Sequence, residues 1–160
     1  MEKPLEARPP TLQDLLKLCE NLNRKGVKYI VVGGMAIAQH GFTRATEDID
    51  LLVDTSIENE RRLKEALLYL PDKAAEDLEA GDIESYMTVR VADEIVIDLM
   101  KSACNVDYER ASKSIVTVVL EGVSIPFASA HMLWEMKQTA REKDLVDRIF
   151  LAEKLKTQCF

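Results

Sequence analysis

Two aspartates separated by a single residue are the first chemical feature of this sequence. Asp48 and Asp50 lie in the run Asp-Ile-Asp-Leu-Leu-Val, which is typical of a buried strand. Because side chains alternate between the faces of a strand, both carboxylates share one face. A third carboxylate, Asp98, lies between Ile97 and Leu99, and a neighbouring strand would bring it to the same point. Three acids in one place need a cation between them, so the pattern predicts a metal site.

Mg²⁺ or Mn²⁺ is the cofactor that this cluster favours. Mg²⁺ takes hard oxygen ligands and is held by a few carboxylates together with substrate phosphates. In a two-metal site, one ion lowers the pKa of an attacking hydroxyl and the other neutralises a triphosphate and its leaving pyrophosphate. We predict that Asp48, Asp50 and Asp98 are catalytic metal ligands, with Asp98 as the ligand or base nearest the acceptor. A solvated strand end is the bland alternative, but carboxylates inside β-branched runs are costly to place unless paired.

Gly33 and Gly34 form the second feature, between the apolar run 28–32 and a helical pattern that begins at Met35. Without a Cβ, backbone N–H groups can approach phosphate oxygens closely, and the start of the following helix adds favourable partial charge. We therefore expect the β- and γ-phosphates of a nucleotide at this turn. Met35 replaces a hydroxyl side chain that would add a phosphate contact, so binding would rest mainly on the backbone.

Three further residues are candidate nucleotide-binding residues: Arg44, Thr46 and Lys137. Arg44 fits either a bidentate phosphate clamp or an ion pair that tethers its loop. Lys137 fits either a triphosphate contact or a solvated helix face, and for Lys143 the solvated face is favoured.

Other polar and aromatic residues are expected to be structural. Asp144 and Asp147 share one helix face, where pairing with Lys143, Arg148 or Arg44 is the ordinary explanation. Neither histidine has a nearby nucleophile, and the tryptophan falls at core spacing. The cysteines are scattered, without zinc-ligand spacing, and are read as reduced thiols. The histidines are His40 and His131, the cysteines are Cys19, Cys104 and Cys159, and the tryptophan is Trp134.

Periodicity and turn residues divide the chain into alternating elements. Thr11 is expected to cap a first helix that ends near Gly26, and residues 72–82 to form an exposed loop. Ala92-Asp93 is expected to connect a hairpin. The predicted strands are 28–32, 48–53, 84–91, 94–100, 114–120 and 123–127; the predicted helices are 35–41, 57–70, 129–139 and 142–156, with Leu133, Met136, Leu145, Ile149 and Leu155 as buried positions.

Composition limits the class of protein. With 160 residues, 47% of them hydrophobic and 31% charged, the chain fits one domain. We expect a flexible lead at 1–10 and a single domain at 11–160, whose part 129–157 is helical. No apolar run approaches the ~20 residues of a membrane span, and no secretory signal begins the chain, so a cytoplasmic protein without a membrane role is expected. The net charge of -7 disfavours a broad grip on nucleic acid but leaves room for a local basic patch.

A family resemblance joins these features. A hydrophobic residue, Gly33-Gly34, thirteen residues and Asp-Ile-Asp-Leu resembles the signature of the polymerase β-type nucleotidyltransferases, and the later Val-Ile-Asp-Leu matches their third acid. Residues 44–50 and the spacing of Lys137, Lys143, Asp144 and Asp147 are similar to small bacterial members, including AbiEii-type toxins and antibiotic nucleotidyltransferases. The resemblance spans 28 to about 151. It implies an α/β (α+β) fold, a mixed sheet flanked by helices, with C-terminal helices.

Three functions are compatible with these patterns. The leading one is Mg²⁺-dependent transfer of a nucleoside monophosphate from an NTP to an acceptor hydroxyl on an RNA end, a protein or a small molecule. The second is a non-catalytic binding module of a toxin-antitoxin-like two-gene system, because only the last ~30 residues remain to build an acceptor pocket and a partner protein would complete it. The third, a phosphohydrolase, gives the Gly-Gly turn no obvious purpose.

Overall fold

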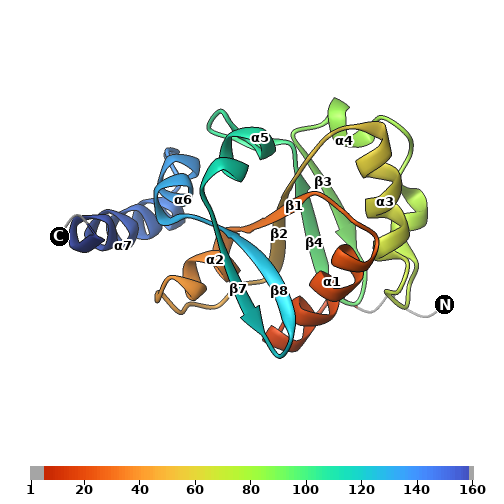
Figure 1. Ribbon diagram of the computed structural model, residues 1–160, viewed down its shortest axis with the longest axis horizontal. Helices are drawn as coiled ribbons and strands as arrows, with labels where there is room; N and C mark the ends of the chain where they lie inside the picture. The colour runs from red at the N-terminus through yellow and green to blue at the C-terminus, as the bar shows by residue number, and fades with distance from the viewer. Residues whose placement is uncertain (1–5, 159–160) are drawn as a thin grey trace.

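A mixed six-stranded sheet forms the centre of the protein (Figure 1). The computed structural model describes residues 6–158. The strand order is β3-β4-β2-β1-β8-β7. β2 runs parallel to β4 and antiparallel to β1, while β1 runs parallel to β8. The strands are β1 (Tyr29–Val32), β2 (Asp48–Val53), β3 (Thr88–Ala92), β4 (Val96–Met100), β7 (Ile115–Leu120) and β8 (Val123–Ala128). The mixed α+β class is confirmed.

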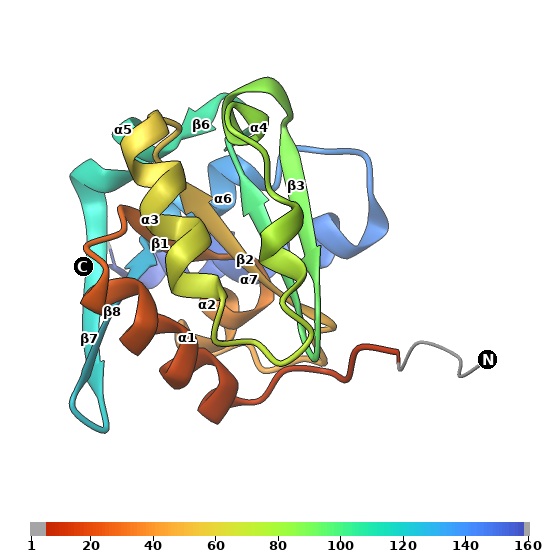
Figure 2. The same ribbon diagram turned by 90° about the vertical axis from the view of Figure 1, so that its right-hand side faces the viewer.

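Helices cover both faces of this sheet. Figure 2 shows α1 (Leu12–Arg24) and α3 (Ile57–Leu67) in front of the sheet, and α2 (Gly33–Gln39) and α6 (Ala130–Met136) behind it. The last helix, α7 (Glu142–Gln158), packs against α6 and extends away from the sheet. Among residues 6–158, no helix is both long enough and apolar enough to cross a membrane.

The first helix begins where the sequence predicts. The Thr11 hydroxyl accepts a hydrogen bond from the Asp14 N–H, and the Asp14 carboxylate accepts one from the Thr11 N–H, which forms a capping box. The apolar face of α1 is buried, with Leu18, Cys19 and Leu22 fully enclosed. The expected alternation along β2 is also observed, because Ile49 and Leu51 are buried while the two aspartates are only partly buried.

The segment 72–82 is largely exposed, as predicted, but it is not a simple loop, and the strand predicted from residue 84 begins at Thr88. A short 3-10 helix, η1 (Ala74–Asp77), and a one-turn helix, α4 (Asp82–Ser85), occupy this segment. Single apolar side chains anchor it, with Leu78 and Ile83 buried. The buried Glu60 carboxylate accepts hydrogen bonds from the N–H groups of Gly81 and Ile83. Such anchoring from a distant helix leaves no periodic pattern in the sequence.

The turn between β3 and β4 is also different from the prediction. It contains three residues, 93–95, in place of Ala92-Asp93. The buried Asp93 carboxylate accepts hydrogen bonds from the N–H groups of Asp72, Ala74 and Glu94, at 3.0, 2.9 and 2.7 Å. This polar anchor fixes the hairpin register, in which Arg90 pairs across from Asp98.

Short elements that the sequence does not predict lie between β4 and β7. They are β5 (Ser102–Ala103), β6 (Val106–Asp107), α5 (Tyr108–Ala111) and a 3-10 turn, η2 (Ser112–Ser114). Cys104 and Asn105 join β5 to β6 with φ angles of 48° and 66°. Strands of two residues are too short to give a readable alternation.

The buried face of α7 is the opposite of the predicted one in two positions. Leu145 and Ile149 are 47% and 59% exposed, while Asp144 and Asp147 are buried. These acids face inward because they form ion pairs with Arg44 and Lys137. On α6, Leu133 and Met136 are buried as predicted, and Leu155 of α7 packs against the core from a partly buried position.

Part of the expected N-terminal lead contacts the domain. The Arg8 N–H donates to the carbonyl of Glu94, and the Arg8 guanidinium pairs with Asp14. Residues 1–5 of that lead, and Cys159, lie outside the described residues. Cys19 and Cys104 are free thiols.

Replacement of Asp93 tests the anchor of the β3–β4 register. Asp93→Ala leaves three backbone N–H groups without their acceptor, so we expect the free energy of unfolding to fall by about 2–4 kcal/mol. Asp77→Ala removes an exposed aspartate of the same segment and is expected to change it by less than about 0.5 kcal/mol. Urea denaturation of both variants measures the difference, and equal midpoints would refute the anchoring role.

Candidate active site

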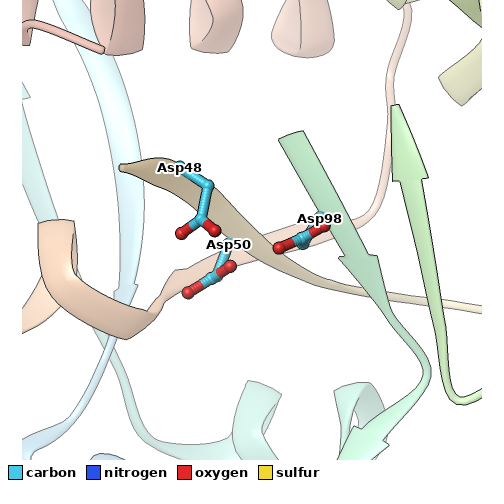
Figure 3. A group of neighbouring side chains, drawn as sticks. All are labelled: Asp48, Asp50 and Asp98. Atoms are coloured by element: carbon cyan, nitrogen blue, oxygen red, sulfur yellow. The ribbon is translucent and has the colours of Figure 1, made fainter. Parts of the chain in front are cut away.

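Three carboxylates converge on one face of the sheet (Figure 3). Asp48 and Asp50 extend from β2 and Asp98 from β4, and one oxygen atom of each lies within 4.8 Å of the others. Asp50 and Asp98 are register partners across the parallel strands. The predicted cluster is therefore formed, and the parallel pairing of β2 with β4 is what brings the third acid to the first two.

Burial and mutual repulsion disfavour the ionised forms of these acids. Burial raises the pKa of Asp50 to about 7, and the charges of Asp48 and Asp98 add to this effect, while two lysines oppose it. Burial also raises the pKa of Asp48, again with a contribution from Asp98. Without a cation, the cluster is thus poised to hold a proton near neutral pH.

The donor set fits a divalent ion of the hard type. All the ligand atoms are carboxylate oxygens, and they come from rigid strands at a spacing that one or two small cations can bridge. A bound cation would remove the repulsion that raises the pKa values. The site is therefore suited to a divalent cation.

Arg90 is a member of this site that the sequence did not reveal. Its Nε and Nη2 atoms donate to the two carboxylate oxygens of Asp98 at 2.9 and 3.0 Å, and Nη2 lies 3.4 Å from Asp48. The side chain nevertheless stays 61% exposed. A two-residue turn at 92–93 would have placed Met87 opposite Asp98. Only the three-residue turn places Arg90 opposite Asp98. Arg90 was therefore missed because the register of this hairpin cannot be read from the sequence.

The two glycines make room for the site. Gly33 has a φ of +68°, and a Cβ at this position would lie 2.1 Å from Oδ2 of Asp50. A Cβ on Gly34 would lie 2.8 Å from Oγ1 of Thr46. That hydroxyl donates to the carbonyl of Asp48 at 3.0 Å. Beyond any approach to phosphate, the turn must therefore be Gly-Gly because the acids and their supporting loop occupy the space of the side chains.

Buried acids of α7 hold the predicted basic residues in place. Arg44 donates to both oxygens of the fully buried Asp147, at 3.0 and 2.9 Å. Lys137 lies 3.1 Å from Asp144 and 3.3 Å from Asp147. Of the partners that the sequence offered for these acids, Arg44 is used. Arg148 instead donates to backbone carbonyls of the connection between α6 and α7.

All of the predicted site residues line one cleft of about 370 Å³. The cleft lies between the sheet and the connection from α6 to α7, and it is also lined by Arg141 of that connection and Lys143 of α7. Neither histidine of the chain is among its lining residues, in line with the structural roles expected for them. The eight predicted residues are Gly33, Gly34, Arg44, Thr46, Asp48, Asp50, Asp98 and Lys137.

The sequence of this chain matches the profile of a known family. The sequence profile of the family described as aminoglycoside-2''-adenylyltransferase matches residues 14–151, which is most of the chain. The chain belongs to this family. It is thus a nucleotidyltransferase-superfamily member from an enzyme family, and the resemblance stated from the Gly-Gly and Asp-x-Asp motifs is confirmed. No curated protein sequence matches the chain.

Solved structures of this superfamily share the fold. A protein of Thermotoga maritima assigned to the nucleotidyltransferases is 19% identical, with a TM-score of 0.59 over 92% of this chain and 91% of that one. ANT(2'')-Ia in complex with adenylyl-2''-tobramycin is 16% identical, with a TM-score of 0.57 over 88% and 87%. An antigenic nucleotidyltransferase-like protein of Paracoccidioides brasiliensis is 18% identical, with a TM-score of 0.53 over 92% and 78%. At these identities the likeness is one of fold.

Alanine at position 33 tests the close approach of the turn to Asp50. Gly122 also has a positive φ, of +81°, but nothing lies within 4 Å of its missing Cβ. Gly122→Ala therefore measures backbone strain alone, about 1–2 kcal/mol. Gly33→Ala adds the collision with the carboxylate, so we expect a clearly larger loss of stability and a loss of Mn²⁺ binding. Thermal unfolding and calorimetric Mn²⁺ titration compare the two, and equal losses in both variants would contradict this role of Gly33.

The raised pKa of Asp50 predicts a pH-dependent stability in metal-free protein. The folded state holds this proton up to about pH 7, whereas the unfolded chain releases it near pH 4. The contribution of Asp50 to the free energy of unfolding therefore falls as pH rises from about 4 to 7. Above pH 7 the loss of stability stays constant. Asp50→Asn removes the titration, so we expect its melting temperature to exceed that of the unsubstituted protein at pH 8 and to match it near pH 4. Mn²⁺ should raise the unsubstituted protein's melting temperature more at pH 8 than at pH 5. A constant difference between the two proteins across this pH range would refute the assignment.

Proposed function

We propose that this protein is a Mg²⁺-dependent nucleotidyltransferase that moves a nucleoside monophosphate from an NTP to an acceptor hydroxyl. The observation that carries the proposal is the convergence of Asp48, Asp50 and Asp98 beside the Gly33-Gly34 turn in one cleft. The family description favours ATP as the donor. The acceptor class is left to an RNA end, a protein or a small molecule at this step.

The acids have distinct tasks in this proposal. Asp48 and Asp50 would hold the metal, and Asp98 would hold it jointly and accept the proton of the acceptor hydroxyl. Mg²⁺ would supply charge neutralisation for the triphosphate and a lowered pKa for the hydroxyl. The acceptor oxygen forms a bond to the α-phosphorus, the bond between the α-phosphorus and the α–β bridging oxygen breaks, and pyrophosphate leaves with that oxygen. The chain's own residues align the two reactants and withdraw the proton.

The phosphate side of the cleft is assigned to the glycine turn and the residues around it. The backbone at Gly33 and Gly34, the Thr46 hydroxyl, Arg44 and Lys137 would contact the triphosphate. Their ion pairs with the α7 acids reduce the net charge of Arg44 and Lys137 but fix their positions, and charged donors in fixed positions orient a phosphate well. The two roles considered for Arg44, a bidentate phosphate contact and an ion pair that tethers its loop, are thus combined. The ion pair with Asp147 positions the guanidinium for the phosphate.

Nucleotidyl transfer can be tested with labelled NTPs, Mg²⁺ and a panel of acceptors, with pyrophosphate release as the readout. Asp50→Asn is expected to lower the rate by at least about 10²-fold, because it removes a metal ligand while keeping the shape of the side chain. Asp77→Asn, at an exposed position outside the cleft, is the matched control and should keep full activity.

Three outcomes would count against the proposed function. Full activity of Asp50→Asn would refute the assigned mechanism. Binding of ATP and Mn²⁺ in calorimetry without pyrophosphate release from any acceptor would favour the binding module of a toxin-antitoxin-like two-gene system, with a partner protein as its ligand. Release of inorganic phosphate in place of pyrophosphate would favour a phosphohydrolase.

A further inference from the structure

The strand order gives the cleft two chemically different sides. The glycine turn follows β1, the acids lie on β2 and β4, and Arg90 lies on β3 at the edge of the sheet. Arg90 is therefore on the far side of the acids from the glycine turn. If the triphosphate lies at that turn, as the proposed function has it, the acceptor must approach the acids from the side of β3. The inference below rests on that proposed function.

Arg90 is held at this side by the acids themselves. Its guanidinium makes a two-point contact with Asp98 and reaches Asp48, so it supplies the positive charge that the repelling carboxylates require in metal-free protein. A divalent cation bound to the same oxygens would repel the guanidinium and compete for its ligands. Because the side chain is 61% exposed, it has room to turn away into the cleft. A guanidinium freed in this way presents a planar fork that matches a phosphate or a carboxylate.

The charges that line the cleft favour the same kind of ligand. Besides the three catalytic acids, one described lining residue is acidic, Asp144, and it is buried against Lys137. The exposed charged residues of the lining are basic: Arg90, Arg141 and Lys143. A polycationic acceptor such as an aminoglycoside would thus meet exposed bases and no uncommitted carboxylate along the described part of the cleft.

We propose that Arg90 is an acceptor-binding residue, and that the acceptor of this protein is anionic, with a phosphate or carboxylate close to the hydroxyl that is modified. Arg90 pairs with Asp98 before the metal binds and with the anionic group of the acceptor afterwards. The exposed bases Arg141 and Lys143 line the same cleft and add to its positive potential. The acceptor preference thus differs from that of ANT(2'')-Ia, whose bound product is an adenylylated tobramycin.

Metal affinity tests the first half of this proposal without any turnover. The Arg90 guanidinium competes with the metal ion for the Asp98 carboxylate, so its removal should strengthen metal binding. We therefore expect Arg90→Gln to bind Mn²⁺ several-fold more tightly in calorimetry at neutral pH. Arg90→Lys should lie between Arg90→Gln and the unsubstituted protein. Lys113→Gln, an exposed charge outside the cleft, is the control and should leave the affinity unchanged. Weaker Mn²⁺ binding by Arg90→Gln would overturn the exchange of partners.

Acceptor binding tests the second half. With a non-hydrolysable ATP analogue and Mg²⁺ present, three anionic probes are titrated: a sugar phosphate, a sugar acid and a short oligoribonucleotide with a free 3′ hydroxyl. Tobramycin is the polycationic comparison. We expect at least one anionic probe to bind and to lose about tenfold or more in affinity in Arg90→Gln, with partial recovery in Arg90→Lys. The affinity for the ATP analogue should change little. The probe that binds best identifies the source of the anionic group.

The outcomes separate this inference from the proposed function. Tighter binding of tobramycin than of every anionic probe, or anionic binding that is unaffected by Arg90→Gln, overturns the inference alone. Binding of neither kind of probe to protein loaded with nucleotide and metal also overturns it. Failure of ATP and Mg²⁺ to bind at all refutes the proposed function first, and this is seen in the same titrations before any acceptor is added.

Discussion

Repulsion among three partly buried carboxylates is the constraint around which this protein is built. Asp48, Asp50 and Asp98 have oxygen atoms within 4.8 Å of one another, and burial raises the pKa of two of them. Such an arrangement costs folding free energy unless cations offset it. The fold supplies Arg90 at one edge and the lysines near α7 at the other. The carboxylate oxygens are grouped closely enough to hold a metal ion, and a bound cation would relieve the remaining repulsion.

The elements far from the acids in sequence hold this site together. α7 lies near the end of the chain, yet its buried Asp147 fixes Arg44, in the loop that leads to β2. Removal of one partner of such a buried ion pair leaves an uncompensated buried charge, which lowers the free energy of unfolding strongly. The helical part 129–157 is therefore not an appendage to a catalytic sheet. It determines where the basic residues of the cleft lie.

Local spacing was sufficient for Asp48 and Asp50, and insufficient for Asp98 and for the cationic partners of the acids. The period of two along β2 placed Asp48 and Asp50 on one face, and the capped first helix was readable from Thr11. Asp98 needed the family resemblance, because spacing alone does not reveal which strands are neighbours. The position of Arg90 depended on the hairpin register, which the turn residue Asp93 fixes by accepting hydrogen bonds from Asp72 and Ala74, outside the hairpin. On α7 the apolar residues misled, since ion pairing decided which face is buried.

The residues that carry the family motifs and the residues proposed to bind the acceptor are under different physical constraints. The glycine turn and the acids are fixed by close packing, where a single Cβ on Gly33 would meet the Asp50 carboxylate at 2.1 Å. On the proposed acceptor side, Arg90 is a long, exposed side chain on the edge strand β3, so its charge can change without a change in the buried core. Substrate preference can therefore change while the chemistry is retained. For this reason we expect the charge of Arg90 to be a better guide to the acceptor than family membership.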